Sequence, residues 1–183
     1  FGVSLKNQDF QVYLQPKVRL SDQKAASAEA LVRWIYPRGE LIFPSNFIPL
    51  LEQNGNICLL DIYVFEKVCI YLNQCIQEKK ELIPISVNLS WVDFKNLNFF
   101  RDFSVLKETY GISDGLIEIE LTKSIFFDTL QRELIKNSIT EIHRYGFGYS
   151  LDDCGVVYSA LTLLKDFDVD TIKLDRQFFS DIT

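Results

Sequence analysis

Four oxygen-bearing side chains lie on separate apolar segments of the sequence, and their types suit one kind of chemistry. Glu29, Asn88, Glu120 and Asp152 offer carboxylate or amide oxygens, which bind Mg²⁺ or Mn²⁺ better than zinc or copper. Asp153 follows directly and is a candidate ligand for a second ion. Two ions ~3.5–4 Å apart polarise a phosphoryl oxygen and activate water in many phosphate-ester hydrolases. The set therefore predicts metal-dependent cleavage of a phosphate ester.

Two cationic side chains extend this candidate site. Arg33 follows Glu29 by four residues on the same face of an extended segment, where its guanidinium can bind a phosphate through two parallel hydrogen bonds. Lys173 is placed to contact the attacking water or the phosphate, with Asp175 as its neighbour. An ordinary structural interpretation stays open for each: an internal ion pair for Lys173 and Asp175, and a surface position for Arg33.

Two acidic residues near the predicted ligands have similar alternatives. Asp153 stands where a strand ends, a position at which aspartate often caps the following helix. Glu118 precedes Glu120 by two residues on the same face and lies deeper, so we interpret it as structural.

The segments that must position these residues alternate between strand and helix patterns. Helices are predicted at 59–76 and 94–110 and around the apolar stripe from Leu130 to Ile142. Such alternation is typical of a mainly parallel sheet covered by helices. The predicted strands are 10–17, 27–34, 83–89, 116–121, 148–151 and 169–174.

The strands are not uniformly apolar, as strands of a sheet covered on both faces would be. Polar residues occupy alternate positions, so that Glu118 and Glu120 oppose Ile117 and Ile119. An open sheet would explain the alternation, but not the gathering of polar groups toward the carboxyl ends of the strands. A (β/α) barrel explains both, since its sites form at the carboxyl-terminal mouth. The predicted fold class is therefore α/β, as a TIM-like (β/α)8 barrel.

Composition excludes several classes of function. A net charge of −6 argues against binding to nucleic-acid polymers, which requires basic surface. No apolar run reaches the ~18 residues of a membrane span, so we expect no membrane contact by this segment. The four cysteines lack CxxC spacing and the chain has one histidine, which argues against a zinc site and favours free thiols in a reducing cytoplasm.

Residues 1–183 are expected to form one domain cut from a longer chain. The sequence starts at Phe1 without a signal-peptide pattern, and it contains no methionine. Any membrane tether would then lie outside the segment, which is expected to be cytoplasmic.

An ordered series of motifs resembles the EAL family along nearly the whole chain. The signature is Glu29-Ala30-Leu31, followed by Val32-Arg33-Trp34. A single Glu-Ala-Leu carries little information, whereas the ordered set is specific. The other motifs are Tyr13-Leu14-Gln15-Pro16, Pro44-Ser45-Asn46-Phe47-Ile48-Pro49, Val87-Asn88-Leu89-Ser90, Glu118-Ile119-Glu120-Leu121-Thr122, Asp152-Asp153 and Val169-Asp170-Thr171-Ile172-Lys173-Leu174-Asp175-Arg176.

The resemblance implies a TIM-like barrel that hydrolyses cyclic di-GMP to linear pGpG with Mg²⁺ or Mn²⁺, with room for two ions. It also implies a homodimer and fusion to a sensory or cyclase domain. The roles that it implies are as follows: metal ligands Glu29, Asn88, Glu120, Asp152 and Asp153; catalytic residues Glu29, Asp153 and Lys173, the last assisting the attacking water; ligand contacts Gln15, Arg33 and Asp175.

Two departures from the family pattern affect one loop. The family's Thr-Glu-Ser reads Thr122-Lys123-Ser124, and lysine cannot accept the hydrogen bonds that the glutamate accepts. The loop after the two aspartates lacks the family's Phe-Gly-Thr-Gly and reads Cys154-Gly155-Val156-Val157. If the lost glycine had a positive φ, a β-branched Val157 would be strained there.

A third departure is length, because about six of the eight strands of a TIM barrel precede Thr183. The family's later Glu and Gln lie beyond this residue, so this segment alone is expected to be inactive.

Three functions stay open for the full-length protein. They are a cyclic di-GMP phosphodiesterase, a weak or inactive cyclic di-GMP receptor, and a partner-binding domain without nucleotide recognition.

Overall fold

Among the residues that the structure describes, the strands form one seven-stranded sheet in the order β1-β2-β4-β5-β6-β7, with the short β3 paired to β2. The computed structural model describes residues 1–36, 39–90, 92, 98–122, 132–154 and 167–174, although not the side chains of residues 98, 122, 132, 153 and 154. The strand bounds are β1 Phe10–Val18, β2 Ala25–Ile35, β3 Leu41–Ile42, β4 Ile85–Asn88, β5 Ile117–Thr122, β6 Gly148–Cys154 and β7 Thr171–Leu174.

The first strand differs from the uniformly parallel arrangement of a standard (β/α)8 barrel. β1 pairs antiparallel with β2, with Gln15 opposite Glu29 and Lys17 opposite Ser27. The connection between the two strands is too short for a crossover helix, so it forms a hairpin closed by Arg19 N donating to Lys24 O at 2.8 Å. The last residues of β1 consequently lie beside the first residues of β2.

The remaining main strands are parallel, as the sequence predicts, and their register is staggered. Glu29 of β2 pairs with Ser86 of β4, whereas Asn88 of β4 pairs with Glu120 of β5. Asp152 of β6 pairs with Thr122, two residues beyond Glu120. A stagger of this kind accompanies the tilt of strands in a barrel wall, and it places these residues along one rim.

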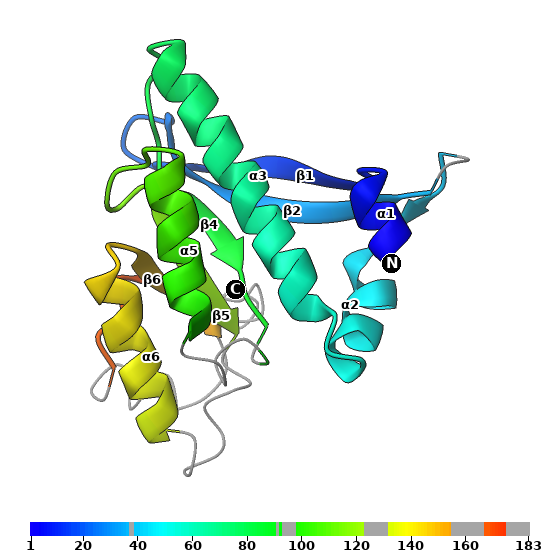
Figure 1. Ribbon diagram of the computed structural model, residues 1–183. Helices are drawn as coiled ribbons and strands as arrows, with labels where there is room; N and C mark the ends of the chain where they lie inside the picture. Colours follow the sequence, from blue (N-terminus) through cyan, green and yellow to red (C-terminus); the bar gives the residue numbers. More distant parts are fainter. Residues whose placement is uncertain (37–38, 91, 93–97, 123–131, 155–166, 175–183) are drawn as a thin grey trace, which may run out of the picture.

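Helices α3, α5 and α6 lie on the same side of the sheet (Figure 1). The predicted apolar stripe of α3 is confirmed, because Leu60, Val64, Val68 and Leu72 are all buried. Helix α2 was not predicted from the sequence, although Pro44 at its first turn is a common helix-start signal. The helix bounds are α1 Gly2–Lys6, α2 Pro44–Gln53, α3 Ile57–Gln77, α5 Asn98–Thr109 and α6 Arg132–Arg144.

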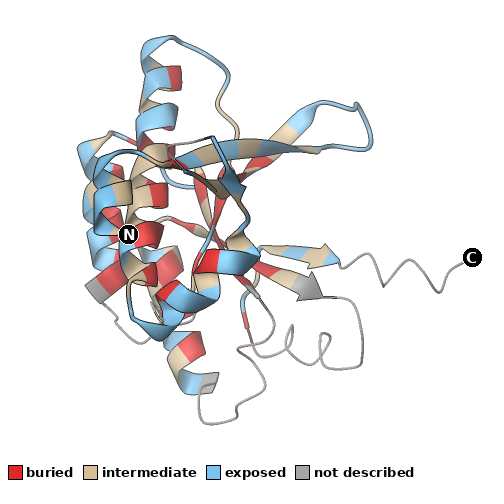
Figure 2. Ribbon diagram, turned by 90° about the vertical axis from the view of Figure 1, so that its right-hand side faces the viewer, coloured by how far each residue is buried: buried red, intermediate tan, exposed pale blue. Residues whose placement is uncertain are grey.

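The core lies between these helices and the apolar face of the strands (Figure 2). Phe65 of α3 stacks on Phe103 of α5 with ring centroids 3.8 Å apart, and it meets Phe147 edge-on. Ile117 and Ile119 of β5 are 1% and 0% exposed, which agrees with the predicted apolar face opposite Glu118 and Glu120. No helix among the described residues is long and apolar enough to cross a lipid bilayer.

Gly146 joins α6 to β6 in a left-handed conformation, and we expect its replacement by alanine to destabilise the fold. Its φ is 75°, and an added Cβ would overlap the side chain of Asp114, a carboxylate that is ion-paired with Lys107. The left-handed conformation alone costs an L-residue about 1–2 kcal/mol. Displacing Asp114 from Lys107 adds to this cost.

Gly111→Ala is the matched control for Gly146→Ala in thermal unfolding. Gly111 also has a positive φ, 66°, but a Cβ there would meet nothing within 4 Å. The control should lower the melting temperature by about 2–4 °C per kcal/mol of strain, and Gly146→Ala should lower it further. Equal shifts for the two variants would contradict a steric contribution from Asp114.

Candidate functional site

Three carboxylates from three strands converge on the amino group of Lys173 on β7. Lys173 Nζ donates to Glu29 Oε2 at 2.8 Å and to Asp152 Oδ2 at 3.2 Å, and it also donates to Glu120 Oε1. Glu29 and Lys173 are 144 positions apart in the sequence. The predicted convergence of these side chains is therefore present in the fold, and Lys173 is ion-paired within the candidate site.

Asn88 joins the same cluster through its amide. Its Nδ2 donates to Glu29 Oε1 at 3.0 Å, which leaves its Oδ1 as the atom able to bind a cation. The next residue continues the strand pairing, with Leu89 N donating to Glu120 O at 3.1 Å. The alternation of β4 thus directs Asn88 to the polar face while Val87 enters the core.

The electrostatics of the cluster are dominated by the burial of Glu120, which is 0% exposed. Burial raises the pKa of Glu120, the hydrogen bond from Lys173 lowers it, and the nearby charge of Glu29 raises it; the net shift is upward. Burial alone lowers the pKa of Lys173, but its hydrogen bonds to Glu120 and Glu29 more than offset this, so its pKa is raised. Lys173 is consequently a stable ammonium.

A second polar layer lies beneath this cluster, and the sequence analysis did not identify it as such. Lys17 of β1 donates to Ser86 Oγ at 2.9 Å and lies 3.7 Å from Glu118 Oε1. It also lies 3.6 Å from Oε2 of Glu120. Thr171 Oγ1 donates to Glu118 Oε2 at 2.9 Å, which agrees with the structural role predicted for Glu118.

Arg33 lies outside the carboxylate cluster but beside it. A pocket of about 350 Å³ is lined by Arg33 together with Asn88 and Ser90, and by residues of α2 and α3. Arg33 Nη1 donates to the neighbouring Val32 O at 2.8 Å, so the side chain is held along the pocket wall. Asn88 lines the pocket and also bonds to Glu29, so the pocket and the cluster are neighbours.

The floor of this pocket contains a carboxylate that the sequence analysis missed. Asp61 is 8% exposed on the otherwise apolar face of α3, and its Oδ2 accepts from Ser90 N at 3.1 Å. Ser90 Oγ in turn donates to Glu52 Oε1 at 2.7 Å. A single acidic residue between Leu60 and Val64 on a buried helix face was the available signal.

The donor set fits a hard divalent cation. Glu29, Asn88, Glu120 and Asp152 present only oxygens that Mg²⁺ or Mn²⁺ can bind, and the buried position of Glu120 favours a compensating positive charge. Three of these side chains, Glu29, Glu120 and Asp152, bind the ammonium of Lys173, so their oxygens already surround one cationic group.

Several of the predicted site residues are described only in part, or not at all, by the structure. Asp153 and Cys154 belong to β6, where the pairing with β7 shifts register between Leu151 and Cys154. Bulges of this kind re-aim side chains beside active sites. Gln15 is exposed opposite Glu29. The side chains of Asp153 and Cys154 lie outside the described part of the structure, and so do the residues Lys123, Val156, Val157 and Asp175.

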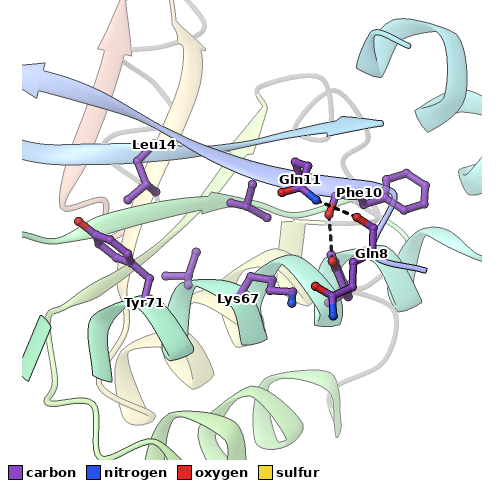
Figure 3. A pocket seen from close by; sticks show the side chains of 9 residues that line it. Gln8, Phe10, Gln11, Leu14, Lys67 and Tyr71 are labelled. Atoms are coloured by element: carbon purple, nitrogen blue, oxygen red, sulfur yellow. Dashed lines mark hydrogen bonds between the residues drawn. The ribbon is translucent and has the colours of Figure 1, made fainter. Parts of the chain in front are cut away.

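A second hollow, of about 190 Å³, lies on the opposite side of β1 and is not a competing site (Figure 3). It lies between β1 and α3 and is lined by Phe10 and Leu14 of β1 and by Lys67 and Tyr71 of α3. It lacks converging carboxylates among its lining residues, so it offers no comparable chemistry.

Comparison with known proteins identifies the family. The profile of the EAL domain matches residues 2–183. The chain is 35% identical over 182 residues to the probable cyclic di-GMP phosphodiesterase PdeB of Escherichia coli K12, covering 96% of this chain and 33% of PdeB. It is 28% identical over 179 residues to the cyclic di-GMP phosphodiesterase NbdA of Pseudomonas aeruginosa, covering 98% of this chain and 23% of NbdA.

Solved structures confirm the fold class. The PaMucR phosphodiesterase, in complex with c-di-GMP, superposes with a TM-score of 0.87 at 26% identity and covers 98% of this chain and 72% of that one. The described sheet and helices are thus part of a TIM-like barrel.

The chain spans about a fifth to a third of the length of curated relatives such as NbdA and PdeB. With the ordered motifs, the profile match and the shared fold in agreement, the chain belongs to the EAL-domain family.

Proposed function

We propose that this chain is the nucleotide-binding part of a metal-dependent phosphodiesterase that converts cyclic di-GMP to linear pGpG. The observation that carries the proposal is the convergence of Glu29, Glu120 and Asp152 on one cation position, beside a pocket walled by Arg33. The names of PdeB and NbdA and the ligand of the PaMucR complex support the same substrate.

In this proposal each residue has a defined task. Glu29, Asn88, Glu120 and Asp152 hold Mg²⁺ or Mn²⁺, and Asp153 serves a second ion. The cation supplies Lewis-acid polarisation of a phosphoryl oxygen and lowers the pKa of water. Lys173 orients the attacking water, while Gln15, Arg33 and Asp175 contact the nucleotide.

The same proposal extends to the setting of the domain. The partners are cyclic di-GMP, a second copy of the chain in a homodimer, and a fused sensory or cyclase domain. We place the domain in the cytoplasm, either free or as the cytoplasmic part of a membrane-tethered protein.

The test is hydrolysis of cyclic di-GMP by the full-length protein in Mg²⁺ or Mn²⁺, beside a Glu29→Ala control. Formation of pGpG that disappears in the control supports the phosphodiesterase. Binding of cyclic di-GMP without product, by a folded protein, would instead support a receptor. A folded protein that binds no cyclic di-GMP would contradict both functions.

The receptor is the second candidate because two departures affect the loop after the paired aspartates. Lys123 replaces a hydrogen-bond acceptor, and Val157 replaces a residue that in the family is glycine. We expect the double substitution Lys123→Glu and Val157→Gly to raise kcat at least severalfold in the full-length protein. A turnover rate that does not change would show that this loop does not limit catalysis.

A further inference from the structure

We propose that Lys17 is a positioning residue for Glu120, and thereby sets how tightly the site binds a divalent cation. The inference rests on the proposed function, in which Glu120 is a metal ligand. Lys17 lies on β1, the antiparallel strand, and enters the barrel from beneath the carboxylate cluster. It does not share the contacts that Lys173 makes with Glu29 and Asp152.

Lys173 and Lys17 lie beside different oxygens of the Glu120 carboxylate. Lys173 Nζ contacts Glu120 Oε1, whereas Lys17 Nζ lies 3.6 Å from Oε2. Because Glu120 is fully buried, its carboxylate orientation depends on such partners rather than on water. Oε2 is buried and accepts no hydrogen bond from the described residues, so the ion pair with Lys17 is the interaction that holds this oxygen on its side of the carboxylate.

The ammonium of Lys17 is itself held in place. It donates to Ser86 Oγ at 2.9 Å, and Ser86 is 1% exposed on β4. Its side chain is only 28% exposed, so the pairing is not an exposed surface contact. This anchoring distinguishes Lys17 from a mobile surface lysine.

Lys17 also separates two negative charges. It lies 3.7 Å from Glu118 Oε1 and 3.6 Å from Glu120 Oε2, between two carboxylates that share one face of β5. Without this cation nothing screens the repulsion between the two neighbouring carboxylates. The Glu120 side chain is then expected to rotate away from Glu118. The positive charge of Lys17 itself repels a divalent cation bound at the site, but the negative charge of the adjacent Glu118 offsets this repulsion. Orientation of Glu120 is therefore the dominant effect.

Outer-shell partners of metal-binding side chains typically affect metal affinity by about 10–100-fold. We expect Lys17→Met to weaken Mn²⁺ binding to the full-length protein by about tenfold, measured by isothermal titration calorimetry without nucleotide. Lys17→Arg should retain most of the affinity, because it keeps the charge. Ser86→Ala should cause a loss in the same direction, since it removes the anchor of Lys17 and also a hydrogen bond to Glu120.

A second substitution separates positioning from general loss of structure. In the Lys17→Met background, Glu118→Gln removes the charge that Lys17 balances, so it should restore much of the Mn²⁺ affinity. A variant that was simply misfolded would not recover, and thermal unfolding of each variant provides the parallel measurement. Lys24→Met, on the exposed end of the hairpin, makes the same change in net charge and should leave Mn²⁺ affinity unchanged.

The outcomes are distinct. Unchanged or tighter Mn²⁺ binding by Lys17→Met, with the unsubstituted protein binding normally, overturns the role of Lys17 and leaves the proposed function standing. A loss that Glu118→Gln does not reduce overturns the balancing of the two carboxylates. An unsubstituted protein that binds no Mn²⁺ overturns both this inference and the proposed function.

Discussion

Replacing Lys173 with methionine is expected to lower the stability of the metal-free protein and, under the proposed function, to abolish most of the hydrolysis by the full-length protein. The substitution leaves Glu29, Glu120 and Asp152 facing one another without the ammonium that they now share. Breaking a buried ion pair from one side costs about 3–5 kcal/mol; since Lys173 is 23% exposed, we expect about 2–3 kcal/mol here. A domain of this size then melts about 4–12 °C lower.

Divalent cations should reverse much of this loss of stability. Under the proposed function, Mn²⁺ or Mg²⁺ binds the carboxylates that now hold the ammonium, and a ligand that binds only the folded state stabilises it. The melting temperature of Lys173→Met should therefore rise more on addition of Mn²⁺ than that of the unsubstituted protein. Hydrolysis should nevertheless stay about 10²–10³-fold lower, as it does when a charged group that stabilises a transition state is removed.

The matched control for Lys173→Met is Lys136→Met, which removes a lysine from the exposed face of α6. It should change neither the melting temperature nor turnover. If Lys173→Met melts like the unsubstituted protein and Mn²⁺ raises both equally, the carboxylates do not depend on this cation. The interpretation of the cluster as a cation site would then be wrong.

Arg33→Ala should selectively weaken the binding of cyclic di-GMP. Arg33 lies along the wall of the pocket beside Asn88, where its guanidinium can reach a phosphate without contacting the carboxylates. A hydrogen bond to a charged group contributes about 1.5–3 kcal/mol, so the dissociation constant should rise about 10–100-fold. Arg33→Lys should recover only part of the affinity, because an ammonium cannot make the paired hydrogen bonds of a guanidinium.

Three further measurements show whether Arg33 acts through the nucleotide. Mn²⁺ affinity and the melting temperature should not change in Arg33→Ala, because the substitution leaves the carboxylate cluster intact. Arg19→Ala removes an arginine paired with Asp22 on the exposed hairpin and should leave cyclic di-GMP binding unchanged. Equal weakening of nucleotide and Mn²⁺ binding would show that Arg33 supports the cluster rather than the nucleotide.

The period of two along the strands explains why much of the site could be predicted from the sequence. That period alone sends Glu29, Asn88 and Glu120 to one face and Val87 and Ile119 to the other. Parallel strands then bring their polar faces to a common mouth. Neither step depends on the details of packing, so an error of one or two residues in a strand boundary does not change the result.

The contributions of Lys17 and Asp61 could not be predicted in the same way. The role of Lys17 depends on β1 running opposite to its neighbours, which brings a residue near the end of β1 below Glu120. Alternation is the same in parallel and antiparallel strands, so it carries no information on direction. The contact of Asp61 with Ser90 depends on how α3 is rotated against β4, and packing of the whole core decides that rotation.

The 144 positions that separate Glu29 from Lys173 have a consequence for the order of events during synthesis. Contacts between such distant residues form late, since the chain must first lose the entropy of a long loop. On a ribosome, the strands bearing Glu29, Asn88 and Glu120 emerge before β7. A nascent chain that ends before β7 therefore has its acidic residues without their lysine, and it cannot yet assemble the cation site. In the proposed function, the capacity to bind nucleotide would therefore arise in one late step, after β1 to β6 have been synthesised.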